Sequence, residues 1–407
     1  MTRRILFVTQ QLPWPKDSGG NIRTYFMLEA LAREFEVVLC STTDGSAKAK
    51  EGERVLGELC HSLRLVPDDK QHSSLGMAIG VLRSLLSGVP AVLLHNENPA
   101  LKSAVVEELQ RGNFDSVHIN HLDTSLYFDF ANSPPCVIDT HNLLFEYYTR
   151  RADVEKSVLR RWVCRREGRL LATQEPEILR GASRVLVCSE AEQASLEALG
   201  GNLTAVVVPN GVDCAQFKPK DTAPSGAGCD LVFVGDLAYG PNQDAALRFI
   251  KEILPLVQCT EPRARFLAVG KNPPTELIEI GARRDDVTVT GFVDDVSDWV
   301  HPAAVYVVPI RYGSGTRLKV LEAFALGKAT VSTSIGAEGI ATREGVDILL
   351  RDDPEEMSQA ILSLLADRDL AARMGLAARQ AVEGNYDWKS IGEVLVGVHR
   401  DIAAPST

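Results

Sequence analysis

The sequence has no closely spaced cysteines. Its eight cysteines are scattered, with neither a C-x-x-C pair nor a tight cluster among them. This spacing argues against a zinc site or a disulfide framework and is typical of reduced thiols in the cytosol. Several of the cysteines stand inside apolar runs, where cysteine is simply a small core residue. We therefore expect a cytoplasmic protein.

An excess of basic residues is also lacking. The chain has 43 Lys and Arg against 54 Asp and Glu, which gives a formal net charge of −11. A protein that binds nucleic acid needs positive charge to contact the phosphates. The composition therefore argues against nucleic acid as a partner, although a local basic patch is compatible with it.

No apolar run has the character of a membrane span. The longest apolar stretch, Leu75 to Leu94, contains Arg83, several serines and glycines, and Pro90. A spanning helix does not normally carry these together without a partner helix. The pattern predicts a helix, a turn and a short strand instead. At the start of the chain, the apolar run 5–8 is too short for a signal peptide and predicts a first strand.

Short apolar runs alternate with helical patterns along the chain, which has no low-complexity tract. The alternation predicts βαβ units, hence α/β domains with mostly parallel sheets whose sites lie past the carboxyl ends of the strands. With 407 residues there is room for two domains, each with its own core. A segment rich in Pro, Gly, Ser and Ala, Lys218 to Cys229, predicts the linker. The strands expected in the first half are 5–8, 37–40, 63–66, 116–119, 137–139, 185–188 and 205–208, with helices such as 21–33 and 99–111 between them.

One segment, Val305 to Gly339, combines the features of an anion site. A buried strand, 305–308, leads into a loop with Gly313 and Gly315, and a helix is expected over 316–326. Free backbone amides and the helix dipole favour an anion at such a loop. Lys319 and Glu322 share one face of this helix and suit a phosphate and a sugar hydroxyl of one ligand. The alternative is an ordinary exposed i,i+3 ion pair.

The segment GSGTRLKVLEAFALGKATVSTSIGAEGI resembles the donor-binding segment of glycosyltransferase family 4, the retaining transferases of the GT-B fold. Further matching pieces follow in the family's order: Ser18-Gly19-Gly20, a strand that ends in His141, VPNGVD at 208–213 and GFVDD at 291–295. The resemblance implies two doubly wound, Rossmann-like domains that face each other across a cleft. These are an acceptor-side domain over 1–210, a nucleotide-sugar donor domain over 211–385, and a helix over 386–407 that crosses back.

The resemblance also implies roles for individual residues. His141 contacts the transferred sugar, Arg317 and Lys319 stabilise the departing diphosphate, and Glu322 accepts hydrogen bonds from the ribose. The other residues expected at the donor are Gly313, Ser314, Gly315, Thr316, Phe292, Val293 and Asn242, and Ser18, Gly19 and Gly20 form a loop beside the acceptor and phosphate. The donor is a nucleotide sugar and no cofactor or metal is expected. The acceptor is a glycan, a lipid-linked molecule or a small molecule.

Two positions depart from the family's pattern. The family often has two glutamates separated by seven intervening residues; here the first is replaced by Ser314 and the second is Glu322. The family also commonly has Arg and Lys after the first strand of the second domain, whereas the segment Gly235 to Asn242 has neither. Arg317 and Lys319 either neutralise the diphosphate alone or the site is weakened. The enzyme alternatives are a nucleotide-sugar epimerase on the same fold or a phosphorylase, and the alternative from another class is an inactive nucleotide-sugar-binding protein.

Structural roles remain open for three of these features. A histidine at a strand end, such as His141, is often bonded to the backbone, and Asp139 is a candidate to orient it. Asp294 or Asp295 suits a helix N-cap as well as a base-binding loop. The basic segment Arg150 to Arg169 predicts a helix with an apolar stripe of Val154, Val158, Leu159, Trp162 and Val163. It either contacts an anionic membrane at the inner face, or an anionic acceptor, or exposes a solvated charged face above a packed stripe.

Overall fold

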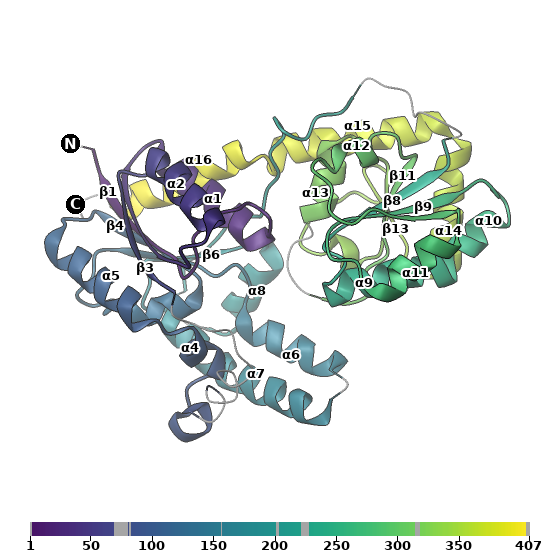
Figure 1. Ribbon diagram of the computed structural model, residues 1–407. Helices are drawn as coiled ribbons and strands as arrows, with labels where there is room; N and C mark the ends of the chain where they lie inside the picture. Colours follow the sequence, from purple (N-terminus) through teal and green to yellow (C-terminus); the bar gives the residue numbers. More distant parts are fainter. Residues whose placement is uncertain are drawn as a thin grey trace. The chain divides into compact units, whose positions relative to one another are not determined.

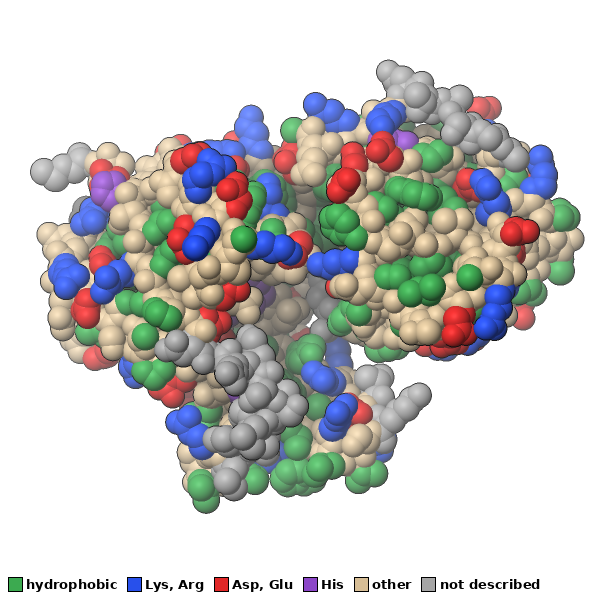
Figure 2. Space-filling view, in the orientation of Figure 1, with side chains coloured by type: hydrophobic (Ala, Val, Ile, Leu, Met, Phe, Trp, Pro, Cys, Tyr) green, Lys and Arg blue, Asp and Glu red, His purple; other side chains and the backbone are tan. Residues whose placement is uncertain are grey.

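The computed structural model describes residues 2–68, 80, 83–155, 157–200, 203–220, 228–313 and 318–403. The chain divides into two compact units, one formed by Met1–Pro209 with Ile391–Thr407 and the other by Asn210–Ser390. Each unit has a parallel sheet with helices on both faces (Figure 1). The acceptor and donor roles assigned to the two domains stay predictions. On the face shown in Figure 2, charged side chains of both signs are interspersed.

The first unit is built on a seven-stranded parallel sheet in the order β3-β2-β1-β4-β5-β6-β7. The apolar runs expected as strands are confirmed. β4 and β5 are buried at every position, as expected when helices cover both faces of a parallel sheet. The strands are β1 (Arg4–Val8), β2 (Glu36–Thr43), β3 (Ser62–Pro67), β4 (Ser116–Asn120), β5 (Cys136–Asp139), β6 (Arg184–Val187) and β7 (Ala205–Val207).

Helices of the first unit follow the expected pattern in part. The described helices are α1 (Gly19–Ala32), α2 (Ala47–Leu59), α4 (Ala91–Asn96), α5 (Pro99–Arg111), the 3-10 helix η1 (Leu122–Tyr127), α6 (Leu144–Val154), α7 (Val158–Leu179), α8 (Glu190–Ala198) and α16 (Trp388–Ile402). α1 and α5 match the helices expected over 21–33 and 99–111. α16 ends in this unit, where His399 is bonded to Ser116 at 2.8 Å and to His118 at 3.2 Å.

Residues 91–96 form a helix, α4, and the expectation of a short strand there is wrong. The helix begins after Pro90, and its first amide, of Ala91, donates to the Glu167 carboxylate at 2.6 Å. Leu93 packs into the core of the first unit. The helix start is satisfied by a carboxylate from α7, which is a long-range contact that the local pattern does not reveal.

The basic segment 150–169 forms parts of two packed helices, so the single expected helix is also wrong. α6 ends at Val154 and α7 begins at Val158. Ser157 caps α7, because its hydroxyl accepts from the Arg160 amide at 3.5 Å, while Glu155 accepts from the Ser157 amide at 3.0 Å. Serine and acidic side chains favour such a helix start over a continuous helix.

The second unit contains a six-stranded parallel sheet in the order β10-β9-β8-β11-β12-β13. The strands are β8 (Asp230–Val234), β9 (Arg265–Val269), β10 (Val287–Val289), β11 (Val305–Val308), β12 (Thr330–Ser332) and β13 (Leu349–Leu350). The described helices are α9 (Gly240–Arg248), the π-helical η2 (Phe249–Ile253), α10 (Leu254–Gln258), α11 (Thr275–Arg283), α12 (Ser297–Val300), α13 (Leu318–Ala325), the 3-10 helix η3 (Ile335–Ala337), α14 (Pro354–Ala366) and α15 (Arg368–Asn385). A core separate from that of the first unit runs through these elements.

Candidate functional site

The order of the strands in the second unit reverses between β8 and β11. β9 and β10 lie on one side of β8, and β12 and β13 lie beyond β11. In doubly wound sheets, ligands bind past the carboxyl ends of two such strands, where the connections diverge. β8 is followed by Gly235 and β11 by Pro309. The expected donor-binding residues Asn242, Gly313 and Lys319 belong to the segments that leave these two strands.

Lys319 is held at this edge by Asn242. The Nζ atom of Lys319 donates to Oδ1 of Asn242 at 2.6 Å, and Nδ2 of Asn242 donates to the Asp236 carbonyl at 2.9 Å. The ammonium also lies 4.4 Å from the centroid of the Phe233 ring, which is a cation–π distance. Asn242 thereby orients the lysine, a role that the sequence did not indicate.

Glycines allow this close packing. A Cβ atom on Gly235 would lie 2.7 Å from Nδ2 of Asn242 and 2.9 Å from Nζ of Lys319. Gly270, which follows β9, has a φ of +147°, and its Cβ would lie 1.8 Å from the Gly235 carbonyl oxygen. Any larger residue at either position would displace the backbone or the Lys319–Asn242 pair.

Glu322 lies one turn after Lys319 on α13 and is partly exposed, while Val320, Leu321 and Phe324 are buried as expected. Burial raises the pKa of Glu322, and the charge of Lys319 acts in the opposite direction. The ammonium of Lys319 is already bonded to an asparagine from another helix. The two side chains are thus not the simple exposed i,i+3 ion pair that helix spacing alone allows.

The glycine loop is described at its first residue only. Gly313 has a φ of +116°, a conformation that glycine adopts far more easily than other residues. Ser314, Gly315, Thr316 and Arg317 lie outside the described residues. The arginine just before the loop, Arg311, forms two hydrogen bonds with the Asp244 carboxylate, at 3.0 and 2.6 Å.

The loop expected beside a nucleotide base also lies at this edge of the sheet. Gly291 forms an antiparallel bridge with Gly270, so the loop joins the end of β9. The Phe292 ring is 73% exposed and Val293 is half-buried. Asp295 accepts from the Ser297 amide at 2.8 Å, but the N-cap of α12 is Val296, so the expectation that Asp294 or Asp295 is the N-cap is wrong.

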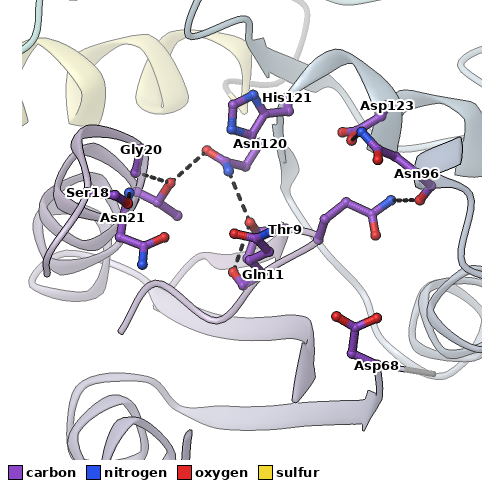
Figure 3. Close-up of a pocket in the computed structure, with 12 residues that line it drawn as sticks. Thr9, Gln11, Ser18, Gly20, Asn21, Asp68, Asn96, Asn120, His121 and Asp123 are labelled. Carbon is purple, nitrogen blue, oxygen red and sulfur yellow. Dashed lines mark hydrogen bonds between the residues drawn. The ribbon is translucent and has the colours of Figure 1, made fainter. Parts of the chain in front are cut away.

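The first unit contains a polar cavity of about 250 Å³ at its own strand reversal, between β1 and β4 (Figure 3). Most of the side chains that line it carry an amide, hydroxyl or carboxylate group. The lining residues are Thr9, Gln10, Gln11, Ser18, Gly20, Asn21, Thr24, Asp68, Asn96, Asn120, His121 and Asp123. These groups suit a polyhydroxylated ligand, which both donates and accepts hydrogen bonds.

Asn120 connects several sides of this cavity. Its Oδ1 accepts from Thr24 at 3.3 Å and is bonded to Nε2 of His141 at 2.9 Å, and its Nδ2 donates to Thr9 at 3.0 Å. Across the cavity, Asn96 donates to Asp123 at 2.8 Å. The side chains are therefore already ordered by one another, which lowers the entropic cost of binding a ligand.

His141 follows β5 and is 6% exposed, with a φ of +55°. Its Nε2 lies 3.3 Å from the Asp139 carboxylate as well as 2.9 Å from Asn120 Oδ1, so Asp139 is near enough to orient it. Both neighbours are acceptors, which places the ring proton on Nε2 and leaves Nδ1 as an acceptor. Burial, followed by the neighbouring His121, lowers the pKa of His141 to about 3. The ring is therefore neutral at physiological pH.

Three residues around His141, namely Asn120, His121 and Arg23, were not predicted from the sequence. The ring of His121 lies 3.8 Å from that of His141, centroid to centroid, and His121 also has a positive φ of 72°. Arg23 is fully buried and binds Asp139 at 2.8 Å. His121 and Asn120 come directly from the end of β4, so the rule that selected His141 at a strand end would also have selected them. Arg23 gives no local signal, because its partner is 116 residues away.

Ser18, Gly19 and Gly20 form the start of α1. Ser18 is the N-cap, and its hydroxyl accepts from the Asn21 amide at 3.3 Å. The Cβ of a residue replacing Gly20 would lie 3.9 Å from Nδ1 of His141. Ser18 and Gly20 line the cavity, so the expected acceptor loop and the histidine belong to one neighbourhood.

The described residues contain neither a candidate metal cluster nor a candidate membrane span. Among them, no group of three or more His, Cys, Asp or Glu side chains is placed to hold a metal ion. None of the helices in that part of the chain is long and apolar enough to cross a membrane. The expectation of metal-independent chemistry stays a prediction.

Family models match both halves of the chain. The model described as Glycosyltransferase Family 4 matches residues 18–216, and the model described as Glycosyl transferases group 1 matches residues 228–367. The two matches meet near the division between the two units.

Curated relatives are similar over part of their length. The chain is 26% identical over 249 residues to a glycogen synthase of Mycobacterium tuberculosis, an alignment that covers 58% of this chain and 59% of the relative. It is 28% identical over 228 residues to a phosphatidyl-myo-inositol mannosyltransferase of Mycolicibacterium smegmatis, covering 54% and 57%. The chain thus spans about three fifths of the length of the curated relatives it matches.

A solved structure matches over almost the whole chain. Alr3699/HepE of Anabaena, in complex with UDP and glucose, has a TM-score of 0.66 and 16% sequence identity, and the match covers 98% of this chain and 99% of that one. At this identity the similarity concerns the fold.

Proposed function

Since the chain belongs to glycosyltransferase family 4 and has the GT-B fold of two doubly wound parallel-sheet domains, we propose that it transfers a sugar from a nucleotide-sugar donor to an acceptor hydroxyl. The observation that carries the proposal is the Lys319–Asn242 hydrogen bond of 2.6 Å at the strand reversal of the second unit. A cation that is fixed there before binding suits a diphosphate.

Stabilisation of the leaving group is the main chemical task in this proposal. The bond between the anomeric carbon and the diphosphate oxygen breaks, and the diphosphate departs with the electron pair. The acceptor oxygen bonds to the anomeric carbon and loses its proton. Because negative charge grows on the diphosphate, a preorganised cation lowers the barrier. Lys319 supplies that positive charge. We assign the same task, stabilisation of the departing diphosphate, to Arg317 and to the backbone amides of 313–316.

The rest of the donor is assigned to neighbouring groups. Glu322 accepts hydrogen bonds from the ribose, and the backbone of Gly291, Phe292 and Val293 lies along the base. We propose retention of the anomeric configuration and no requirement for a metal. Uridine diphosphate sugars are the first donors to test, because Alr3699/HepE binds UDP and glucose.

On the acceptor side, we assign the cavity of the first unit to a polyhydroxylated group. Neutral His141 contacts the transferred sugar, and Ser18, Gly19 and Gly20 border the reacting groups. The acceptor is a glycan, a lipid-linked molecule or a small molecule. For the lipid-linked case, we propose a peripheral contact with the cytoplasmic face of a membrane through the basic segment 150–169.

A donor panel tests this function. The protein is incubated with nucleotide sugars that differ in base and sugar, and release of nucleoside diphosphate is measured with and without glycan acceptors. We expect acceptor-dependent release for one donor class, with a product whose anomeric configuration, measured by NMR, matches that of the donor. Lys319→Ala should abolish most of the release, whereas Lys251→Ala, which removes an exposed lysine of the same unit paired with Glu276, should not. If the protein binds nucleotide sugars but neither transfers nor hydrolyses any of them, the proposal is contradicted.

A further inference from the structure

The first two turns of α7 expose three large apolar side chains. Val158 is 80% exposed, Leu159 71% and Trp162 46%. Trp162 follows Val158 by four residues and Leu159 by three, so the three side chains share one face of the helix. Single exposed apolar residues are ordinary, but a contiguous group of this kind marks an interaction surface.

This face points away from the packed side of α7. Cys164, Glu167, Gly168 and Leu171 are buried on the other side of the helix. A Cβ on Gly168 would lie 3.0 Å from Oγ1 of Thr149 on α6, so the two helices are in close contact there. Val158 and Leu159 therefore contribute little to the packing of the α6–α7 hairpin, and Trp162 is about half-buried.

A second apolar pair lies beside the same helix. Residues 83–87 are helical, and Leu85 and Leu86 are 49% and 83% exposed. Arg166 of α7 joins this segment to the hairpin through hydrogen bonds to the hydroxyl and the carbonyl of Ser84, at 2.6 and 2.7 Å. Figure 2 shows hydrophobic side chains gathered in the region where Figure 1 places α7. We call Leu85, Leu86, Val158, Leu159 and Trp162 the apolar face of the hairpin.

Basic side chains continue this face. Arg165 and Arg169 are exposed and follow Trp162 by three and seven residues, which is about 4.5 and 10.5 Å along the helix axis. Residues 150–169 include eight basic and three acidic residues, although the whole chain carries a net charge of −11. Tryptophan and aliphatic side chains flanked by arginine are typical of helices that lie in the interface of an anionic bilayer.

We propose that the apolar face of the hairpin docks on a membrane that contains anionic phospholipid. Val158, Leu159 and Trp162 enter the boundary between headgroups and acyl chains, and Arg165 and Arg169 remain among the headgroups. This goes beyond a contact by the charge of the basic segment, because apolar side chains supply the larger part of the binding. Several of its arginines are engaged within the fold, such as Arg150 with Glu146 at 3.2 Å and Arg161 with the Glu155 carbonyl at 2.9 Å. The proposal is independent of sugar transfer.

Co-sedimentation with vesicles tests the proposal. Vesicles of phosphatidylcholine with phosphatidylglycerol should bind the full-length protein, and vesicles of phosphatidylcholine alone should bind it less. Replacing Val158, Leu159 and Trp162 together with serine should weaken the partition by at least about tenfold, because it removes the apolar area that becomes buried. The double variant Arg165→Gln and Arg169→Gln should lose less vesicle binding than the triple serine variant. Its remaining binding should no longer depend on anionic lipid. Added salt should weaken the binding of the wild type without abolishing it.

Two controls make the outcome decisive. Leu376→Ser removes an apolar side chain that is 61% exposed on α15 of the other unit, and it should bind vesicles like the wild type. The tryptophan fluorescence of the wild type should shift to the blue on vesicle binding, and Trp162→Phe should lose most of that shift.

Two outcomes would contradict the proposal. The wild type would not bind anionic vesicles at low salt, or the triple serine variant would bind them as well as the wild type does. Self-association that the triple variant loses, without vesicle binding, would assign the face to a second copy of the chain. Release of nucleoside diphosphate with a water-soluble acceptor should be the same in all variants, which separates this test from that of the transfer reaction.

Discussion

Nζ of Lys319 and Oδ1 of Asn242 lie 2.6 Å apart, although 77 residues separate them in the chain. The asparagine is itself fixed by its bond to the Asp236 carbonyl. A flexible lysine side chain is thus restricted before a ligand arrives, so less conformational entropy is lost when it contacts an anion. The segment Gly235 to Asn242 has no lysine or arginine of its own. Its contribution is to place a lysine that comes from α13.

Asn242 is therefore predicted to act as a positioning residue. Asn242→Ala should lower kcat/KM by about tenfold, since Lys319 loses its orienting hydrogen bond. Asn242→Asp keeps a hydrogen-bond acceptor but adds a negative charge beside the diphosphate. It should therefore be the worse variant and should raise the donor KM. Steady-state kinetics on both variants checks this, and an aspartate variant with wild-type kinetics would limit Asn242 to a structural role.

Lys319→Ala and Arg317→Ala should each lower kcat/KM by at least about a hundredfold, on the scale of losing one oxyanion donor. The loss should appear in kcat as well as in KM, because the contact strengthens as the diphosphate departs. Lys319→Arg should restore little activity, since a planar guanidinium does not fit the site that the glycine at 235 opens for a compact ammonium. Near-normal kcat in both alanine variants would mean that the diphosphate is held elsewhere.

Glu322→Gln should weaken donor binding far more than it affects folding. The carboxylate accepts hydrogen bonds from the ribose in our proposal, and glutamine keeps the size of the side chain and therefore its packing. We expect the donor KM to rise by at least about tenfold, as for the loss of a hydrogen bond to a charged group. Thermal unfolding of the unliganded variant serves as the control and should match that of the wild type. An unchanged donor KM would remove Glu322 from the site.

His141→Ala should lower kcat for sugar transfer and leave the binding of free nucleoside diphosphate largely intact. The neutral ring contacts the sugar in our proposal, whereas the nucleotide is held by residues of the second unit. Calorimetric titration with nucleoside diphosphate, alongside kinetics, separates the two effects. The exposed His61→Ala is a matched control. Loss of nucleotide binding together with activity would indicate that His141 only maintains the fold.

Glu175 predicts a pH dependence of stability. Burial raises its pKa from 4.5 to about 7, although it accepts backbone hydrogen bonds from Leu144 and Phe145 that act in the opposite direction. Between pH 4.5 and 7 the folded state retains a proton that the unfolded state releases, so this group makes the protein less stable as the pH rises. The total effect is on the order of 3 kcal/mol, and it is constant above about pH 7.

Chemical denaturation of the wild type and Glu175→Gln at several pH values tests this. As the pH rises from 4.5 to 7, the unfolding free energy of the wild type should fall relative to that of the variant. The glutamine amide loses one of the two backbone hydrogen bonds, but that cost does not depend on pH. Glu177→Gln, at an exposed position of the same helix, is the control. A pH-independent difference for Glu175→Gln would contradict the prediction.

Local sequence patterns were enough to predict the strands, the order of the βαβ units and the glycosyltransferase family. Apolar runs such as 305–308 and 137–139 became strands because central strands of a parallel sheet are buried on both faces, which leaves a local signature. Local spacing, together with the resemblance to short family motifs, predicted three site residues, Lys319, Glu322 and His141.

Contacts between groups that are distant in the sequence depend on the three-dimensional fold. Asn242 reaches Lys319, the ring of His121 lies against that of His141 and Arg23 neutralises Asp139 only because the sheet order brings the ends of separate strands together. The same holds for the two wrong expectations. The first amide of α4 donates to the Glu167 carboxylate from α7, and the helical pattern of the basic segment is interrupted where Ser157 caps α7. Hydrophobic periodicity records which face of an element is buried, but it carries no information about the partner on the other side of the contact.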